Sequence, residues 1–348
     1  MYLGILLVVF SAFFGFCSHA AAKDKKPASV EEYDETTYSR LHVDKDNRLY
    51  HIYLTEDGRI EKRYVGSDNK KQDKVEINVP SDNFNFYLIK YDGATNNIFF
   101  CDESDIMHYY DSKGKDIASF SLRDIWKKTK KRSYIWFEDI KRRNNRICVI
   151  AGKGYNNTNR VYAEYDIRAK KITKKQKLKI DGNVEQLRMY GDKYIYGIRK
   201  TGSVQVSGNK ITDGRKHSVV VYDYTGRLRY EMDYTHLMTN YTDEGYYEIF
   251  GNYRYNEGRQ ALENHVDNLY DVRDGYVYVA TRKGIYKCKT GKKHFKKMVD
   301  LSSCEFCDTK NYIASFKYID KDKYGFSVGI DNYVDNFRDM IYIVKGVK

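Results

Sequence analysis

The sequence predicts an all-β repeat fold, and three observations support this prediction. The first is a turn, typified by Tyr-Asp-x-x-Gly, that recurs about every 55 to 65 residues and ends at Gly114, Ala169, Gly226, Gly291 and Gly346. The second is that runs rich in Tyr, Val, Ile and Phe lie on both sides of the turns before the chain end, as the strands of a β-hairpin do. The third is composition: 35 tyrosines suit pleated strands, and only two prolines interrupt them.

This period is typical of a β-propeller, in which each repeat is a four-stranded antiparallel blade. Residues 84–122 contain the whole pattern, with strands at residues 84–89, 97–101, 106–110 and 115–122. The glycine that ends the turn has a mechanical role, because a tight hairpin needs a residue that tolerates positive φ. Six blades account for the length, at residues 39–79, 84–122, 136–180, 185–234, about 268–301 and 313–348. Five or seven blades remain open, because the segment after Tyr234 can hide or interrupt a blade.

The two ends of the chain resemble each other and predict how the ring closes. Asp44-Lys45-Asp46 and Asp320-Lys321-Asp322 each lie in a turn between the first two strands of a blade. The last blade stops at its third strand, so we expect residues 30–38 to supply its missing outer strand and to cover the exposed edge. A rival phasing treats residues 53–58 as another copy of the recurring turn and shifts the first blade by one hairpin.

The organisation is one domain behind an export signal. Residues 1–22 carry no charge and have an apolar stretch that ends in small residues, which predicts a secretory signal peptide; an uncleaved anchor and a lipid on Cys17 are the alternatives. Residues 23–38 are expected to form the leader with the closing strand, and residues 39–348 a single propeller domain. We therefore expect a secreted protein, with association to the cell surface as the alternative, and with no transmembrane segment after signal removal.

Cysteines and acidic turns give weak signals for metals, and we expect no cofactor and no metal. Cys304 and Cys307 have the spacing of half a zinc site or a redox pair, but no second pair accompanies them. We expect one of them to bridge to Cys288 or to lie beside its neighbour, and Cys101 and Cys148 to be core residues. The Asp-x-Asp turns lack the rest of a calcium loop, so local backbone hydrogen bonds are the preferred interpretation.

The net charge of +13 comes partly from basic runs. They lie at residues 127–132, 141–143, 170–175 and 292–297. Outside the cell such runs fit an anionic polymer or an anionic membrane surface rather than nucleic acid. Charges that keep an edge strand solvated are the simpler interpretation. Trp126 and Trp136 lie on either side of the first run; Trp136 fits core packing, whereas Trp126 fits either packing or sugar stacking.

The catalytic residues remain unknown at this level. No phosphate loop or dinucleotide fingerprint is present, and the scattered histidines form no recognised motif. Propeller enzymes assemble their sites from loops of several blades, so this absence leaves catalysis open. Three segments break the period and are the places where specific function is expected: residues 126–132, 200–216 and 235–264.

The Tyr-Asp-x-x-Gly units behind a signal peptide resemble secreted bacterial six-bladed β-propellers of the broad TolB-like or lipoprotein-receptor-like type. The resemblance covers nearly all of the mature chain but is one of pattern, and the Tyr-Trp-Thr-Asp motif of the receptor group is missing. It implies functions that range from interaction scaffolds to hydrolases and lyases, and no site residue carries over. We expect a non-catalytic binding protein with an unknown extracellular ligand, an anionic polymer or glycan being one class, at one mouth of the propeller. A propeller hydrolase or lyase acting on carbohydrate or peptide, and a protein held electrostatically to the cell envelope, are the alternatives.

Overall fold

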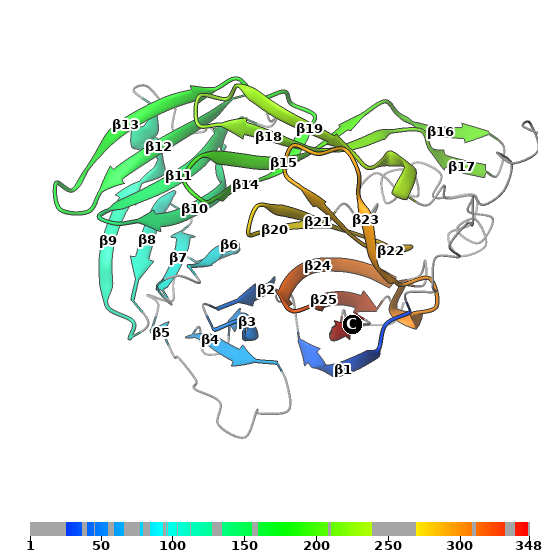
Figure 1. Ribbon diagram of the computed structural model, residues 1–348. Coiled ribbons are helices and arrows are strands. Elements are labelled where there is room, and N and C mark those ends of the chain that lie inside the picture. Colours follow the sequence, from blue (N-terminus) through cyan, green and yellow to red (C-terminus); the bar gives the residue numbers. More distant parts are fainter. Residues whose placement is uncertain are drawn as a thin grey trace, which may run out of the picture.

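The described residues form six four-stranded antiparallel sheets arranged as the blades of a ring (Figure 1). The computed structural model describes residues 26–36, 40–44, 46–54, 59–65, 77–78, 84–92, 95, 97–102, 104–111, 113–126, 134–154, 159–207, 210–238, 269–307, 311–330 and 338–346. The first strand of each blade lies nearest the ring centre, and the last lies outside (Figure 1). The predicted six-bladed all-β fold is confirmed. The predicted signal peptide, residues 1–22, lies outside the described residues.

Blades 1 to 3 follow one another along the chain. Blade 1 contains β2 (Arg40–Val43), β3 (Leu49–Leu54), β4 (Arg59–Tyr64) and β5 (Ile77–Asn78). Blade 2 contains β6 (Phe84–Asp92), β7 (Asn97–Asp102), β8 (Ile106–Tyr110) and β9 (Asp116–Ser121). Blade 3 contains β10 (Ile135–Arg143), β11 (Arg146–Lys153), β12 (Arg160–Asp166) and β13 (Lys171–Leu178). Residues 53–58 thus span the end of β3 and the segment before β4, and the rival phasing is wrong.

Blades 4 and 5 continue the pattern with one insertion. Blade 4 contains β14 (Val184–Tyr190), β15 (Tyr194–Thr201), β18 (Lys216–Asp223) and β19 (Leu228–Asp233). Between β15 and β18, the loop predicted at residues 200–216 forms a separate hairpin of β16 (Val204–Ser207) and β17 (Lys210–Asp213), away from the ring centre (Figure 1). Blade 5 contains β20 (Leu269–Arg273), β21 (Tyr276–Thr281), β22 (Gly284–Lys289) and β23 (Lys296–Asp300).

Blade 6 is completed by the N-terminal part of the chain. It contains β24 (Asn311–Asp320), β25 (Lys323–Ile330), β26 (Arg338–Lys345) and, as its outer strand, β1 (Ser29–Thr36). β1 runs antiparallel to β26, with Ser29 opposite Lys345 and Tyr33 opposite Ile341. The expected closing strand is therefore confirmed, and its pairing covers the edge that β26 would otherwise expose.

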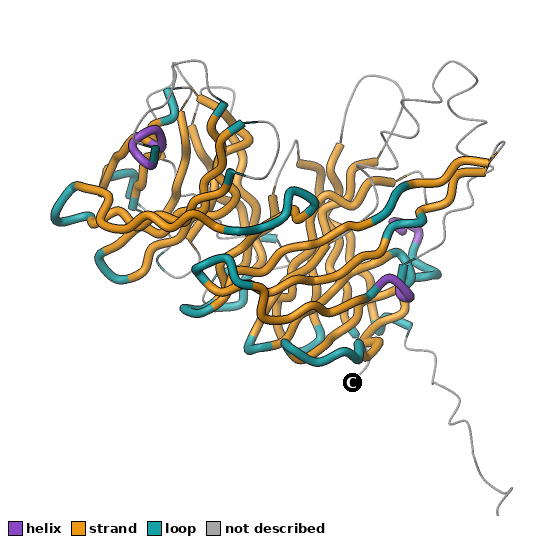
Figure 2. Tube along the Cα trace, turned by 90° about the horizontal axis from the view of Figure 1, so that it is seen from above, coloured by secondary structure: helices purple, strands orange, loops and turns teal. Residues whose placement is uncertain are grey.

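Helical structure is confined to single turns in the described part of the chain (Figure 2). These 3-10 turns are η2 (Leu122–Ile125), η3 (Thr235–Leu237) and η5 (Glu305–Cys307). None of the helices in the described ranges has the length and apolar character needed to cross a bilayer. Of the predicted excursion at residues 235–264, only η3 and Met238 belong to the described residues.

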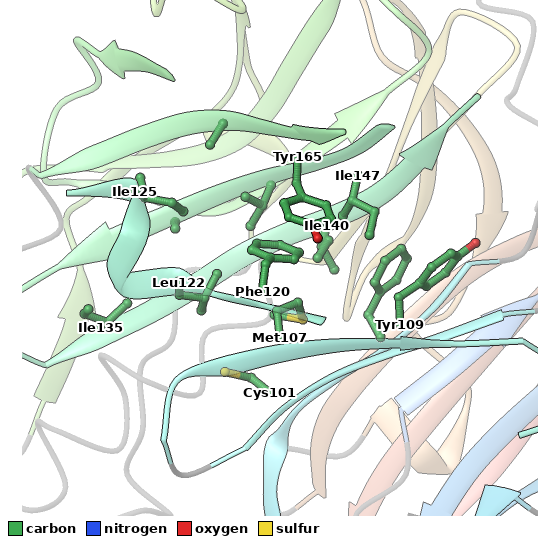
Figure 3. Close-up of a cluster of buried hydrophobic side chains, with 14 residues drawn as sticks. Cys101, Met107, Tyr109, Phe120, Leu122, Ile125, Ile135, Ile140, Ile147 and Tyr165 are labelled. Atoms are coloured by element: carbon green, nitrogen blue, oxygen red, sulfur yellow. The ribbon is translucent and has the colours of Figure 1, made fainter. Parts of the chain in front are cut away.

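Hydrophobic cores lie between neighbouring blades, because each blade buries side chains on both faces. The core between blades 2 and 3 is typical: Phe120 from β9 stacks on Tyr165 from β12, with ring centroids 4.6 Å apart (Figure 3). Comparable clusters join blades 3 and 4, 4 and 5, 5 and 6, and 6 and 1. Burial of apolar surface between repeats thus holds the ring together.

The recurring turn connects the third and fourth strands of a blade, and the aspartate in it acts as a local cap. Oδ1 of Asp111 accepts the backbone N–H groups of Lys113 and Lys115, each at 2.9 Å. Oδ1 of Asp223 accepts the corresponding groups of its own turn, at 2.9 and 3.1 Å. The closing glycine adopts positive φ, 81° at both Gly114 and Gly226, as expected for this hairpin. In the third blade the positive φ falls on Lys170 at 50°, which explains why Ala169 is tolerated.

A buried histidine in blade 1 predicts how stability depends on pH. His51 on β3 is 5% exposed, and burial, followed by the charge of Arg63, lowers its pKa to about 4. An unfolded histidine has a pKa near 6.5. Between that pH and about 4, the unfolded state therefore binds a proton that the folded state does not bind. We expect the free energy of unfolding to be unaffected above pH 6.5 and to fall by about 3 kcal/mol as the pH drops to 4.

Urea unfolding midpoints measured between pH 7 and 4.5 check this expectation. The variant His51→Gln should lose most of the slope in this window, because the remaining shifted carboxylates, such as Asp223 with a pKa lowered to about 2, titrate at lower pH. An unchanged slope in the variant would assign the acid sensitivity to other groups.

Candidate binding site at the ring centre

Inner strands of five blades bring charged side chains together at the ring centre. We call this set the axial cluster; its members are Lys90 of β6, Asp139 of β10, Arg188 of β14, Asp271 of β20 and Lys317 of β24. The ammonium group of Lys90 contacts Oδ1 of Asp139, and Nζ of Lys317 lies 4.0 Å from Oδ1 of Asp271. The charges of Arg188 and Lys317 both act on Lys90, so residues far apart in sequence share one electrostatic environment.

The carboxylates of this region also connect neighbouring blades through the backbone. An innermost strand has one edge without a partner strand, so its N–H groups on that side need acceptors. Register shifts in β10 and β14 bring Glu138 and Asp139 of blade 3 against β14 of blade 4. Glu138 accepts the N–H of Leu187 at 2.8 Å, and Asp139 accepts that of Met189 at 2.6 Å. The two consecutive acids therefore accept hydrogen bonds from backbone N–H groups on an edge of β14 that no strand covers.

Asp271 has the same role between blades 5 and 6, and it is the most heavily hydrogen-bonded carboxylate of the axial cluster. It accepts the backbone N–H groups of Val272 at 3.0 Å and of Tyr318 at 3.1 Å. It also accepts the hydroxyl of Tyr190 at 2.7 Å. Three hydrogen-bond donors and the nearby ammonium group of Lys317 therefore already engage this carboxylate.

Positive charge is in excess around Lys90. Lys90 lies within electrostatic range of three other cations, Lys141, Arg188 and Lys317, and of two carboxylates, Asp92 and Asp139. Burial lowers the pKa of Lys90 well below its ordinary value, and the charges of the other three cations add to the shift. An anion placed among these cations would reduce their mutual repulsion.

Solvent reaches the axial cluster even though its acids are buried. The side chain of Asp139 is 2% exposed, whereas those of Lys90 and Lys317 are 31% and 20% exposed. The side chains of Lys90 and Lys317 are thus more exposed to solvent than the acid that Lys90 contacts.

The axial cluster was not predicted, although the sequence contains a signal for it. The inner strands that form the cluster have a charged residue directly before an apolar or aromatic one, as in Lys90-Tyr91, Arg188-Met189 and Lys317-Tyr318. Such a charge in an otherwise buried strand is unusual, and its repetition from blade to blade could have marked the ring centre.

The carboxylates of the Asp-x-Asp turns form hydrogen bonds with residues nearby in the chain, which was the preferred interpretation of the sequence. Oδ1 of Asp44 accepts the N–H groups of Asp46 and Arg48, both at 2.9 Å, and its Oδ2 lies 2.8 Å from Nε of Arg48. In the matching turn, Oδ1 of Asp322 lies 3.4 Å from the hydroxyl of Tyr324. Within the described ranges, no group of three or more His, Cys, Asp or Glu side chains could hold a metal ion.

The bridge from Cys304 or Cys307 to Cys288 is not formed, because these cysteines lie in different cores. Cys288 packs between blades 4 and 5, whereas Cys304 and Cys307 pack against the core between blades 5 and 6. All five described cysteines are free thiols, and Cys101 and Cys148 are buried core residues as predicted. Cys304 and Cys307 are neighbours in one turn, where the N–H of Cys307 donates to the carbonyl of Cys304 at 2.9 Å. Burial raises the pKa of Cys288 and of Cys304, which disfavours thiolate chemistry.

Trp136 packs against its own blade, as expected. Its indole N–H donates to the carbonyl of Gly154 at 3.0 Å, and its ring lies so close to Gly152 that a Cβ there would be 2.1 Å from it. Trp126 also packs against the core between blades 2 and 3. The basic run at residues 127–132 lies outside the described residues, so the proposed pairing of Trp126 with it is not tested.

The remaining basic runs divide between the ring centre and the outer edge. Lys141 lies near Lys90, and Arg143 forms an ion pair with Asp192 at 2.9 Å. The run at residues 170–175 lies on and before β13, the outer strand of blade 3, and the run at residues 292–297 precedes and begins β23. Only the first of these runs therefore contributes to the axial environment.

The fold and the axial cluster define a six-bladed β-propeller with a charged centre. No protein-family model and no curated protein matches the chain. Several solved structures do: a luciferin-regenerating enzyme is 14% identical, with 92% of this chain and 95% of that one covered and a TM-score of 0.47. YCF48 bound to a D1 peptide is 7% identical (92% and 98% covered, TM-score 0.45). BamB from Moraxella catarrhalis is 8% identical (93% and 92% covered, TM-score 0.37). At such values the chain's own residues must carry any functional argument.

Proposed function

We propose that the protein is a secreted, non-catalytic binding protein whose ring centre holds the negatively charged group of a ligand. The observation that carries this proposal is the excess of cations in the axial cluster. Lys90, Arg188 and Lys317 come from three different blades, and solvent contacts two of their side chains. Charge-assisted hydrogen bonds from such groups to a carboxylate or phosphate are among the stronger polar interactions.

The engagement of the acids favours binding over catalysis. A hydrolase or lyase would need a carboxylate or another base with room to take a proton. Asp139 already contacts Lys90 and accepts the N–H of Met189, and Asp271 accepts three hydrogen bonds. These acids position the cations and join the blades, which leaves the cations to meet the ligand.

The experiment is a calorimetric titration with two defined probes, inorganic phosphate and glucuronate, at constant ionic strength. We expect at least one probe to bind the wild-type protein, and Lys317→Met to weaken that binding about tenfold or more, as for loss of a hydrogen bond to a charged group. Lys317 is chosen instead of Lys90 because Lys90 contacts the buried Asp139. Removing Lys90 would leave this carboxylate without its cation and would destabilise the fold.

The matched control is Lys289→Met on β22, the third strand of blade 5, where the lysine side chain is exposed. It removes the same charge from the protein and should leave the affinity unchanged. Failure of both probes to bind, or equal weakening in the two variants, would contradict the proposed site.

A further inference from the structure

A second concentration of positive charge lies at the outer edge of blade 3, independent of the ring centre. Residues 166–181 contain β13 and its flanks and hold seven cationic side chains but only two carboxylates, Asp166 and Asp181. The seven cations are all exposed: Arg168, Lys170, Lys171, Lys174, Lys175, Lys177 and Lys179. We call this surface the basic edge.

Few of these cations serve the fold. Lys174 forms an ion pair with Glu164 at 3.4 Å, and Lys175 donates to the carbonyl of Asp124. Within the part of the chain that the structure describes, the other four lysines form no ion pair: Lys170, Lys171, Lys177 and Lys179. Crowding them on β13 and directly beside it costs free energy through like-charge repulsion, with no ion-pair partner in the described structure to offset it.

The other blades show that edge protection does not require this charge. Outer strands are normally kept from pairing with other molecules by a few charged residues of either sign. β9 has one charged residue, Asp116; β19 mixes Arg229 with Glu231 and Asp233; β23 combines Lys296 and Lys297 with Asp300; β1 is acidic. β13 occupies the same position in its blade, yet its charged residues are all lysines. The basic edge therefore exceeds what its structural position demands.

We propose that the basic edge docks a linear phosphodiester polymer of the poly(glycerol phosphate) type. Alternate residues of an extended strand lie about 7 Å apart on one side, so Lys175 and Lys177 place two positive charges at about that spacing on one side of β13. Residues 166–181 contain no aromatic side chain on which a sugar ring or a base could stack. Recognition through charge alone fits a polymer of regularly spaced phosphates, for which lysine is a common partner.

The test measures binding of purified poly(glycerol phosphate) to the wild-type protein over a range of salt concentrations. We expect affinity to fall steeply with salt, because each phosphate contact releases counterions. Changing Lys170, Lys171, Lys177 and Lys179 together to Gln should lower the affinity at least tenfold at low salt. It should also reduce the slope of log affinity against log salt by about 3, from about 0.7 for each lost contact.

The matched control changes four exposed lysines of blade 5 to Gln, namely Lys289, Lys292, Lys293 and Lys296, which removes the same net charge. It should keep most of the affinity and of the slope. Equal losses in the two variants would mean that net charge alone attracts the polymer, and the assignment would fail. It would also fail if polygalacturonate, a carboxylated polymer, bound the wild-type protein as tightly as the phosphodiester did. Neither result depends on the ring centre.

Discussion

Replacing Asp139 with alanine is expected to lower the free energy of unfolding by about 3 to 5 kcal/mol, as for loss of one partner of a buried ion pair. Asp139 is 2% exposed and has two roles at once. It neutralises Lys90, which otherwise meets the charges of Arg188, Lys317 and Lys141, and it accepts the N–H of Met189 in the next blade. The alanine variant leaves both groups without this acceptor.

Companion variants separate the two roles, and urea unfolding measures all of them. Asp139→Asn can still accept the N–H of Met189 but loses the negative charge, so it should be intermediate. The double variant Lys90→Met with Asp139→Leu should be less destabilised than the sum of its single changes, because no charge is left unpaired. Asp116→Ala on exposed β9 is the control and should shift stability by no more than about 0.5 kcal/mol. An Asp139→Ala effect as small as that of the control would remove the structural role assigned to the axial acids.

Replacing Arg160 with methionine should cost a comparable amount, about 3 to 5 kcal/mol. Arg160 is completely buried between blades 3 and 4. Its Nε lies 2.5 Å from Oε1 of Glu138, and its Nη atoms donate to the carbonyls of Asp181 at 3.1 Å and of Val184 at 2.5 Å. Methionine fills much of the volume but leaves a buried carboxylate and two carbonyls without this donor.

Arg160→Lys tests whether the planar guanidinium matters, because lysine keeps the charge but cannot donate to three acceptors in that geometry. We expect it to recover only part of the lost stability, as measured by thermal and urea unfolding. A cycle with Glu138→Gln should show coupling, since the amide retains an acceptor for Leu187 while removing the charge. Additive effects in this cycle would show that Arg160 stabilises the fold without Glu138.

Most of the architecture was predictable because the same turn recurs in several blades and its residues interact with close neighbours in the chain. The turn residues Asp111 and Gly114, and their counterparts Asp223 and Gly226, act within a few residues of chain, so their pattern can be read directly. The closing strand followed from a simple deficit: the last blade ended at its third strand, and β1 supplies the fourth. The hairpin between β15 and β18 was less predictable. The glycines of this segment indicated a loop, although Val204 and Val206 alternate as in a strand.

The candidate site was not predicted, for a physical reason. Its members are separated by about one blade or more along the chain, and only ring closure brings Lys90 and Lys317 into one environment. Register shifts in β10 and β14, which no sequence rule marked, decide that Glu138 and Asp139 face the next blade. The expected bridge to Cys288 failed similarly, because spacing along the chain does not reveal which core a cysteine enters.

The central claim is that the cations of the ring centre bind an anion, and the most direct test is the affinity of wild-type protein and Lys317→Met for phosphate and glucuronate across pH. We expect the wild-type protein to bind near neutral pH and the variant to lose about tenfold or more in affinity. We also expect affinity to fall with rising pH before the ordinary lysine range is reached, because the lowered pKa of Lys90 makes this ammonium group lose its proton early. Absence of binding at every pH, or an affinity that Lys317→Met leaves unchanged, would contradict it.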